Sequence, residues 1–183
     1  ELKIGSNSEI DRDIKDETGA NNLECLALQI AMQESKLKHC KDNGGDCFEC
    51  STGGLLKGSD GKSNGVMQIN VDAHPDANVG DFTGNVKYAV QNVLVPRYWQ
   101  NRVKERDYAC NGKKYTGWKI ALRYYNGWNT DCSKGDKDYV ENVLGWAGEI
   151  KSLFPEDCGD DGSEEVVNPE SAEFGIPIDS SDI

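Results

Sequence analysis

Helical periodicity dominates the pattern of apolar and polar positions along the chain. The clearest stretch is LECLALQIAMQESKL, residues 23–37, whose apolar residues recur on one stripe at about 100° per residue. Asn21 or Asn22 can cap the start of this helix. The glycine-rich segment beyond Lys38 cannot continue it. The pattern therefore predicts a buried helix that ends near Lys38.

Three later segments show the same periodicity. One runs from Asn85, and Pro96 predicts a kink or a break in it. A second covers Trp118–Tyr125 and ends at an Asn-Gly pair, and a third covers Lys137–Phe154. Strand signals are scarce, so the expected class is mainly α, a helical domain with long loops.

Charge divides the chain into three parts. Residues 1–20 are polar and predict a loose arm, with room for one short helix, and residues 21–155 form the predicted domain. The segment 156–183 holds ten acidic residues and no Lys or Arg, so it carries −10 of the net charge of −12. It is typical of a solvated tail or linker, the alternative being a docking segment that ends in FGIPI. The remaining body is nearly neutral and gives no electrostatic case for nucleic acid as a partner.

No stretch is apolar and long enough for a membrane span. The first residues lack the basic and apolar regions of a signal peptide, so either the protein is made without a signal or the signal has been removed.

Seven cysteines are many for a reduced cytosolic protein of 183 residues. Their place in polar loops favours disulfides and an extracytoplasmic location, secreted, periplasmic or bound to the cell envelope. Cys110 and Cys132 flank one helical segment and make a candidate pair. The stretch HCKDNGGDCFEC allows a competing interpretation, a zinc site. Its four possible ligands are His39, Cys40, Cys47 and Cys50. We favour disulfides, and the odd count leaves one cysteine unpaired in a monomer.

A carboxylate lies in the middle of the first apolar stripe. Glu34 either rotates to water and pairs with Lys36 or Lys38, or is held in an apolar pocket. Burial there would raise its pKa, so that it could hold a proton near neutral pH. Glycoside cleavage requires such an acid, which holds a proton near neutral pH.

Four motifs occur in order along the chain and favour the second alternative, in which Glu34 is held in a pocket. They are ES at 34–35, SNGVMQIN at 63–70, ALRYYNGWN at 121–129 and YVENVL at 139–144. Together they resemble the lytic transglycosylase family of the lysozyme-like superfamily, which is related to goose-type lysozyme. The resemblance covers roughly residues 21–154 and implies a lysozyme-like α-helical domain. One departure is Tyr124, which stands where the family has alanine.

The resemblance implies roles for particular residues. Glu34 would be the catalytic acid and base, and Ser35 would hydrogen-bond near the reacting sugar. The implied substrate-binding residues are Ser35, Gly65, Met67, Gln68, Tyr125 and Asn126. The residues alone favour core positions for the Met67 and Ile69 side chains. If that stretch alternates as a strand, Gln68 points the other way, toward the cleft.

A single carboxylate implies a reaction assisted by the substrate. The expected activity is cleavage of peptidoglycan between N-acetylmuramic acid and N-acetylglucosamine, leaving 1,6-anhydromuramic ends. If Asp72, Asp76 or Asp81 positions a water, the same cleft would run hydrolysis as a lysozyme. A glycan-binding module without activity is the third alternative. We expect no cofactor and no metal; the expected partners are glycan strands and, through the termini, other envelope or secretion components.

Overall fold

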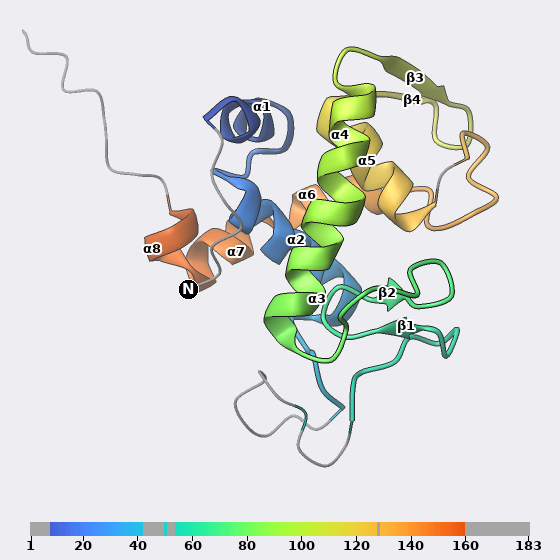
Figure 1. Cartoon of the computed structure of the whole chain (residues 1–183). Helices are drawn as coiled ribbons and strands as arrows, with labels where there is room; N and C mark the ends of the chain where they lie inside the picture. Colours follow the sequence, from blue (N-terminus) through green and yellow to red (C-terminus); the bar gives the residue numbers. More distant parts are fainter. Residues whose placement is uncertain (1–7, 42–49, 51–53, 128, 160–183) are drawn as a thin grey trace, which may run out of the picture.

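The computed structural model describes residues 8–41, 50, 54–127 and 129–159. Helices predominate, and two small antiparallel hairpins accompany them (Figure 1). The mainly α class is thus confirmed. The helices are α1 Ser8–Thr18, α2 Leu23–Ser35, α3 Phe82–Tyr88, the π-helical turn η1 Ala89–Leu94, α4 Val95–Asn101, α5 Gly117–Asn126, α6 Tyr139–Gly145, α7 Ala147–Leu153 and α8 Pro155–Cys158. The strands are β1 Ser63–Asn64, β2 Ile69–Asn70, β3 Glu105–Tyr108 and β4 Lys113–Thr116. β1 pairs with β2, and β3 pairs with β4.

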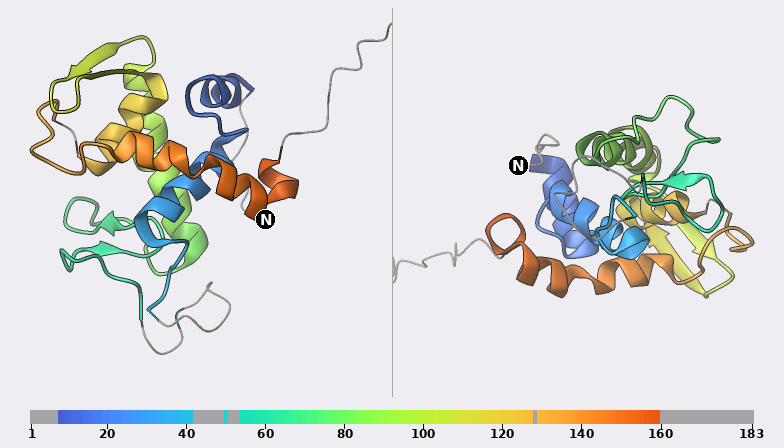
Figure 2. Two further views of the ribbon diagram at one scale, coloured as in Figure 1. Left: turned by 180° about the vertical axis from the view of Figure 1, so that it is seen from behind. Right: turned by 90° about the horizontal axis from the view of Figure 1, so that it is seen from below.

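Helix α2 is the centre of the fold, and α1, α6, α7 and α8 all contact it (Figures 1 and 2). Its residues are buried on nearly every side, as expected for a helix inside a core. The Asn22 side chain caps it by accepting a hydrogen bond from the Cys25 N–H at 2.8 Å, as predicted. The helix ends at Ser35, earlier than Lys38, because Lys36 takes the left-handed conformation with φ 56°. Glu34 therefore lies in the last turn of a buried helix.

A single rod of α3, η1 and α4 packs beside α5 (Figure 1). It begins earlier than the predicted Asn85, because the Asp81 carboxylate caps it by accepting from the Gly84 N–H at 2.7 Å. Pro96 neither breaks nor ends the rod. It lies in the first turn of α4, directly after the π-helical turn, where its missing N–H falls at a change in hydrogen-bonding pattern.

The predicted helix over Lys137–Phe154 is wrong in its continuity. The chain forms α6, α7 and α8 in succession, with Trp146 at the first junction. The Trp146 Nε1–H donates to Gln33 Oε1 at 2.9 Å, a contact with a segment far away in the sequence. Tyr139, Val143 and Ile150 from the predicted apolar stripe are nevertheless buried.

The N-terminal segment is more than the loose arm that its composition suggested. Within residues 8–18, α1 buries Ile10 and Ile14 in the common core. The Glu17 carboxylate also accepts a hydrogen bond from the Trp118 N–H at 2.6 Å, at the start of α5.

The C-terminal boundary of the packed domain lies beyond the expected residue 155. Helix α8 returns to the start of α2, where Cys158 forms a disulfide with Cys25. The Asn21 side chain donates to the Cys158 carbonyl at 3.1 Å. Most of the acidic tail, residues 160–183, lies outside the described residues.

Three disulfides link Cys25 to Cys158, Cys40 to Cys50, and Cys110 to Cys132. The predicted Cys110–Cys132 pair is confirmed, and disulfides favour an oxidising environment. Cys47 lies outside the described residues. The zinc interpretation loses two of its four possible ligands, because Cys40 and Cys50 bond to each other. A further possible zinc ligand, His39, is fully buried, and its Nδ1 accepts a hydrogen bond from the Val66 N–H at 3.2 Å.

Candidate active site

A cleft of about 1250 Å³ is lined by residues from the region of the β1–β2 hairpin, from η1 and α4, and from the end of α5 and the segment that follows it. Figure 1 shows where these elements lie in the fold. The last turn of α2 contributes Glu34 to the cleft. The region of the β1–β2 hairpin forms one wall, and η1 and α4 contribute Asn92, Val93 and Arg97. Its lining residues are Glu34, Gly58, Ser59, Asp60, Ser63, Gln68, Ile69, Asn70, Ala73, His74, Asn92, Val93, Arg97, Tyr124, Tyr125, Asn126, Gly127, Lys134 and Gly135. Its volume exceeds the roughly 300–1,000 Å³ of small-ligand pockets and suits an extended ligand.

Glu34 lies in this cleft and not on the solvated side of its helix. Its carboxylate accepts a hydrogen bond from the Tyr139 hydroxyl. Burial raises the pKa of Glu34 to about 7, although the Tyr139 hydrogen bond acts in the opposite direction. No ion pair between described residues involves Glu34, so pairing with Lys36 or Lys38 is wrong. An acid in this state is about half protonated at neutral pH.

Two tyrosines surround the acid. Tyr139 comes from the start of α6, and Tyr125 comes from the end of α5. Burial and the neighbouring charge of Glu34 hold the pKa of both phenols well above the ordinary value, so both remain hydrogen-bond donors. The Tyr125 hydroxyl donates to the Met67 carbonyl at 2.5 Å. Tyr125 thus ties α5 to the opposite wall beside Glu34.

The wall around residues 65–68 is a turn and not an alternating strand. Gln68 has φ 48°, and its side-chain amide donates to the Gly65 carbonyl at 2.7 Å. Gln68 does line the cleft, but a turn places it there. The Met67 side chain is fully buried, as expected from its residue type, and it contributes only its carbonyl to the site.

Gly65 has a backbone role in this wall. It adopts φ +74°, and a Cβ there would lie 2.7 Å from Asn85 Nδ2 and 2.9 Å from His39 Cε1. Only glycine satisfies both the left-handed conformation and the close approach. Neither Gly65 nor Ser35 lines the cleft. The Ser35 hydroxyl donates to the Ala31 carbonyl of its own helix at 3.0 Å.

The rim opposite this wall follows α5. The Asn126 side-chain oxygen accepts a hydrogen bond from the Asp136 N–H, which fixes the segment that carries Lys134 and Gly135. Gly135 approaches so closely that a Cβ would lie 2.2 Å from the Asn126 carbonyl oxygen. Asn126 therefore lines the cleft and also shapes its edge.

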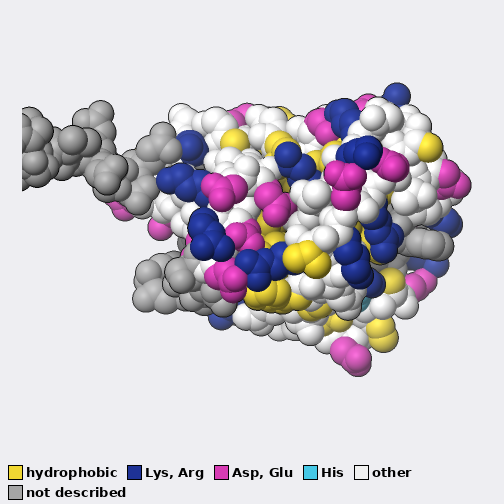
Figure 3. All heavy atoms as spheres, turned by 90° about the horizontal axis from the view of Figure 1, so that it is seen from above, with side chains coloured by type: hydrophobic (Ala, Val, Ile, Leu, Met, Phe, Trp, Pro, Cys, Tyr) yellow, Lys and Arg dark blue, Asp and Glu magenta, His cyan; other side chains and the backbone are white. Residues whose placement is uncertain are grey.

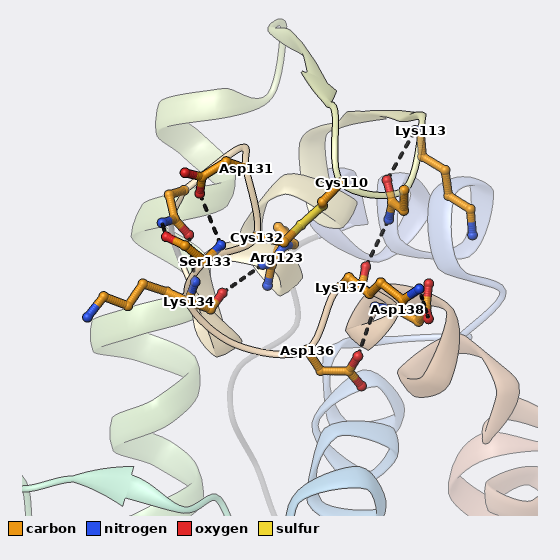
Figure 4. The surroundings of a disulfide bond; sticks show 12 residues. Cys110, Lys113, Arg123, Asp131, Cys132, Ser133, Lys134, Asp136, Lys137 and Asp138 are labelled. Carbon is orange, nitrogen blue, oxygen red and sulfur yellow. Dashed lines mark hydrogen bonds and ion pairs between the residues drawn. A yellow bond between two sulfur atoms is a disulfide. The ribbon is translucent and has the colours of Figure 1, made fainter.

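The Cys110–Cys132 disulfide anchors this rim to the turn after β3 (Figure 4). Beside it lies the fully buried Arg123, whose Nη2–H donates to the Lys134 carbonyl at 2.8 Å (Figure 4). A covalent link and a buried side chain thus hold the same rim.

None of the three loop aspartates that could have supplied a second carboxylate lines the cleft. Asp72 pairs with Lys62, and Asp81 caps α3. Asp76 is exposed. The second acidic residue of the cleft is Asp60, which the sequence did not single out. It accepts hydrogen bonds from the Ser63 N–H and hydroxyl, both at 2.8 Å, and they hold its pKa below the usual value.

Of the residues that the resemblance implied, the structure brings Glu34, Gln68, Tyr125 and Asn126 together in one cleft. It also places Tyr139, which is buried and does not line the cleft, in hydrogen-bond contact with Glu34; the only signal of Tyr139 in the sequence is the first position of the YVENVL motif. Within the described residues, no group of three or more His, Cys, Asp or Glu side chains is placed to hold a metal ion. None of the described helices is both long and apolar enough to cross a membrane.

No protein-family model, curated protein or solved structure matches this chain.

Proposed function

We propose that this protein is a peptidoglycan lytic transglycosylase with a lysozyme-like fold and with Glu34 as its single acid and base. The observation that carries the proposal is the Glu34 carboxyl, which lies in a long cleft and has a pKa raised to about 7. The cleft also presents amide groups from Gln68, Asn70 and Asn126, which suit sugar hydroxyl and acetamido groups.

The mechanism begins with general acid catalysis. Protonated Glu34 gives its proton to the glycosidic oxygen, and the bond from that oxygen to C1 of the muramic acid breaks. The acetamido oxygen of the same sugar stabilises the positive charge that develops at C1. This assistance by the substrate removes the need for a second carboxylate.

Glu34, now ionised, then acts as the base. It takes the proton from the C6 hydroxyl, and the C6 oxygen attacks C1 to close the 1,6-anhydro ring. No water enters, and Glu34 recovers its proton. The Tyr139 hydroxyl is placed to stabilise the ionised intermediate state, because it donates to the Glu34 carboxylate.

A hydrolytic muramidase is the second candidate, and Asp60 is the observation that favours it. This carboxylate lines the same cleft as Glu34 and has a lowered pKa, so it is ionised near neutral pH. Such a base could direct a water to C1. A glycan-binding module without activity is the remaining alternative, and the raised pKa of Glu34 argues against it.

The location and partners follow from this proposal. Peptidoglycan lies outside the cytoplasm, and three disulfides suit a secreted, periplasmic or envelope-associated protein. Glycan strands are the proposed partner, and the termini are the regions that could contact other envelope or secretion components.

Digestion of purified peptidoglycan separates the candidates. The masses of the fragments released by the wild type are measured by mass spectrometry, with Glu34→Gln as the inactive control. Fragments lighter by one water than reducing ends support transglycosylation. Reducing ends that disappear in Asp60→Asn would favour hydrolysis, and an absence of cleavage by the wild type would leave only binding.

A further inference from the structure

An aromatic residue flanked by two arginines forms part of the cleft wall, and the proposed mechanism does not use it. Tyr124 and Arg97 both line the cleft that contains Glu34. The Arg97 guanidinium lies over the Tyr124 ring at 5.0 Å from its centroid, and the Arg106 guanidinium lies at 5.3 Å. Arg106 also donates to the Tyr124 hydroxyl at 2.8 Å. Three elements, α4, α5 and β3, therefore converge on one cationic feature, which we name the arginine ridge: Arg97, Tyr124 and Arg106.

Among the described residues, the arginine ridge carries positive charge and has no ion-pair partner. None of the ion pairs between described residues involves Arg97 or Arg106. Arg97 is exposed and donates to an uncharged group, Gln100 Oε1, at 3.1 Å. Its other N–H groups are available to a ligand in the cleft. On the molecular face seen in Figure 3, basic and acidic side chains are interspersed.

The geometry restricts the chemistry of that ligand. A guanidinium is planar and presents paired N–H groups that match the two oxygens of a carboxylate. Stacking on Tyr124 holds the Arg97 plane in place, so less side-chain entropy is lost on binding. The two arginines share the Tyr124 ring as a common contact.

We propose that the arginine ridge binds a carboxylate on the substituent at O3 of a muramic acid residue in the bound glycan. This inference rests on the proposed function, and it names the part of the substrate that sets preference. Two sources carry that chemistry: the free lactyl carboxylate of a stem-free strand, and the carboxylates of an attached peptide stem. Chitin oligosaccharides have the same sugar backbone and acetamido groups but no carboxylate, so they serve as the neutral reference.

The test measures binding to the full chain carrying Glu34→Gln, which prevents turnover. The ligands are stem-bearing peptidoglycan fragments, stem-free fragments and chitin oligosaccharides of equal length. We expect at least one carboxylate-bearing ligand to bind about fivefold more tightly than chitin at low salt, as for a partly exposed charge pair. Whichever ligand shows the preference identifies the source of the carboxylate. The preference should decline with added salt.

Two variants and one control assign the effect. Arg97→Gln, at an exposed position, should abolish the preference, and Tyr124→Phe, which keeps the ring but loses the hydroxyl bonded to Arg106, should reduce it. Arg12→Gln removes an arginine with a 64% exposed side chain on α1, outside the cleft, and should leave the preference intact. Equal affinities for all three ligands, or equal effects of Arg97→Gln and Arg12→Gln, would overturn the inference.

Cleavage of the same fragments by the wild type keeps the two proposals apart. If the wild type cleaves none of them but the preference that depends on Arg97 is present, the transglycosylase proposal fails and carboxylate recognition stands. If it cleaves peptidoglycan fragments without any such preference, recognition by the ridge fails alone.

Discussion

Replacing Glu34 by glutamine should stabilise the protein at alkaline pH and change its stability little in acid. The pKa of Glu34 is raised from 4.5 to about 7 in the folded protein because burial disfavours its charge. Between these two values the unfolded chain has lost the proton while the folded protein still holds it. The free energy of unfolding therefore falls as the pH rises through this window.

The size of the effect follows from the shift. Each pKa unit corresponds to about 1.36 kcal/mol, so the full shift amounts to about 3 kcal/mol. This contribution is fully present below pH 4.5, is lost progressively as the pH rises, and is absent above about 7. Glutamine has a similar shape and no charge. At pH 8 it should therefore recover up to about 3 kcal/mol relative to the wild type.

Urea unfolding at pH 4 and pH 8, with the disulfides intact, measures this difference. The relevant quantity is the stability of Glu34→Gln relative to the wild type at pH 8, minus the same quantity at pH 4. Glu149→Gln is the matched control, because Glu149 is exposed on α7 and its replacement makes the same chemical change outside the cleft. It should give a value within about 0.5 kcal/mol of zero. A value near zero for Glu34→Gln as well would refute a buried acid with a raised pKa.

Four further outcomes follow from the structure. The kcat/KM for peptidoglycan cleavage should be level below about pH 7 and fall tenfold per unit above it, because the first step requires protonated Glu34; a rise above pH 7 would contradict this. Tyr139→Phe removes a hydrogen bond that lowers the pKa of Glu34, so a pH–rate profile should show the alkaline limb moved to higher pH; a purely structural role would leave its position unchanged. Gly65→Ala should lower the free energy of unfolding by about 2 kcal/mol in urea titrations, since φ +74° and the nearby side chains both oppose a Cβ; an unchanged midpoint would show that the turn relaxes. Replacing Cys25 and Cys158 together by serine opens a link across 133 residues and should lower the free energy of unfolding by about 5 kcal/mol relative to the oxidised wild type in urea titrations; after full reduction the variant and the wild type should be about equally stable, and an unchanged midpoint without reductant would contradict the role of this link.

The features that were predicted from the sequence depend on neighbours along the chain. Asn22 caps α2 through the N–H of Cys25, three residues away, and such local patterns are legible in a sequence. Apolar periodicity likewise located α2 and α5. The same signal is present for α1, where Ile10 and Ile14 lie four residues apart and share a helix face.

The features that the sequence did not indicate depend on distant contacts. The junction between α6 and α7 involves Trp146 and Gln33, which are 113 residues apart, so periodicity alone favoured one continuous helix. Asp60 belongs to a turn whose carboxylate serves local N–H groups, and only the fold brings that turn to the cleft of Glu34. Gln68 was expected in the cleft by strand alternation and reaches it through a left-handed turn.

The proposed function depends above all on Glu34 as the acid of a glycan-cleaving cleft. The most direct measurement compares the initial rates at which the wild type and Glu34→Gln release 1,6-anhydromuramic ends from purified peptidoglycan at pH 6, with binding of both proteins to the same material checked in parallel. We expect a loss of about a thousandfold or more in rate with binding retained, since an amide has no proton to give. A Glu34→Gln variant that cleaves within a few-fold of the wild type would contradict it.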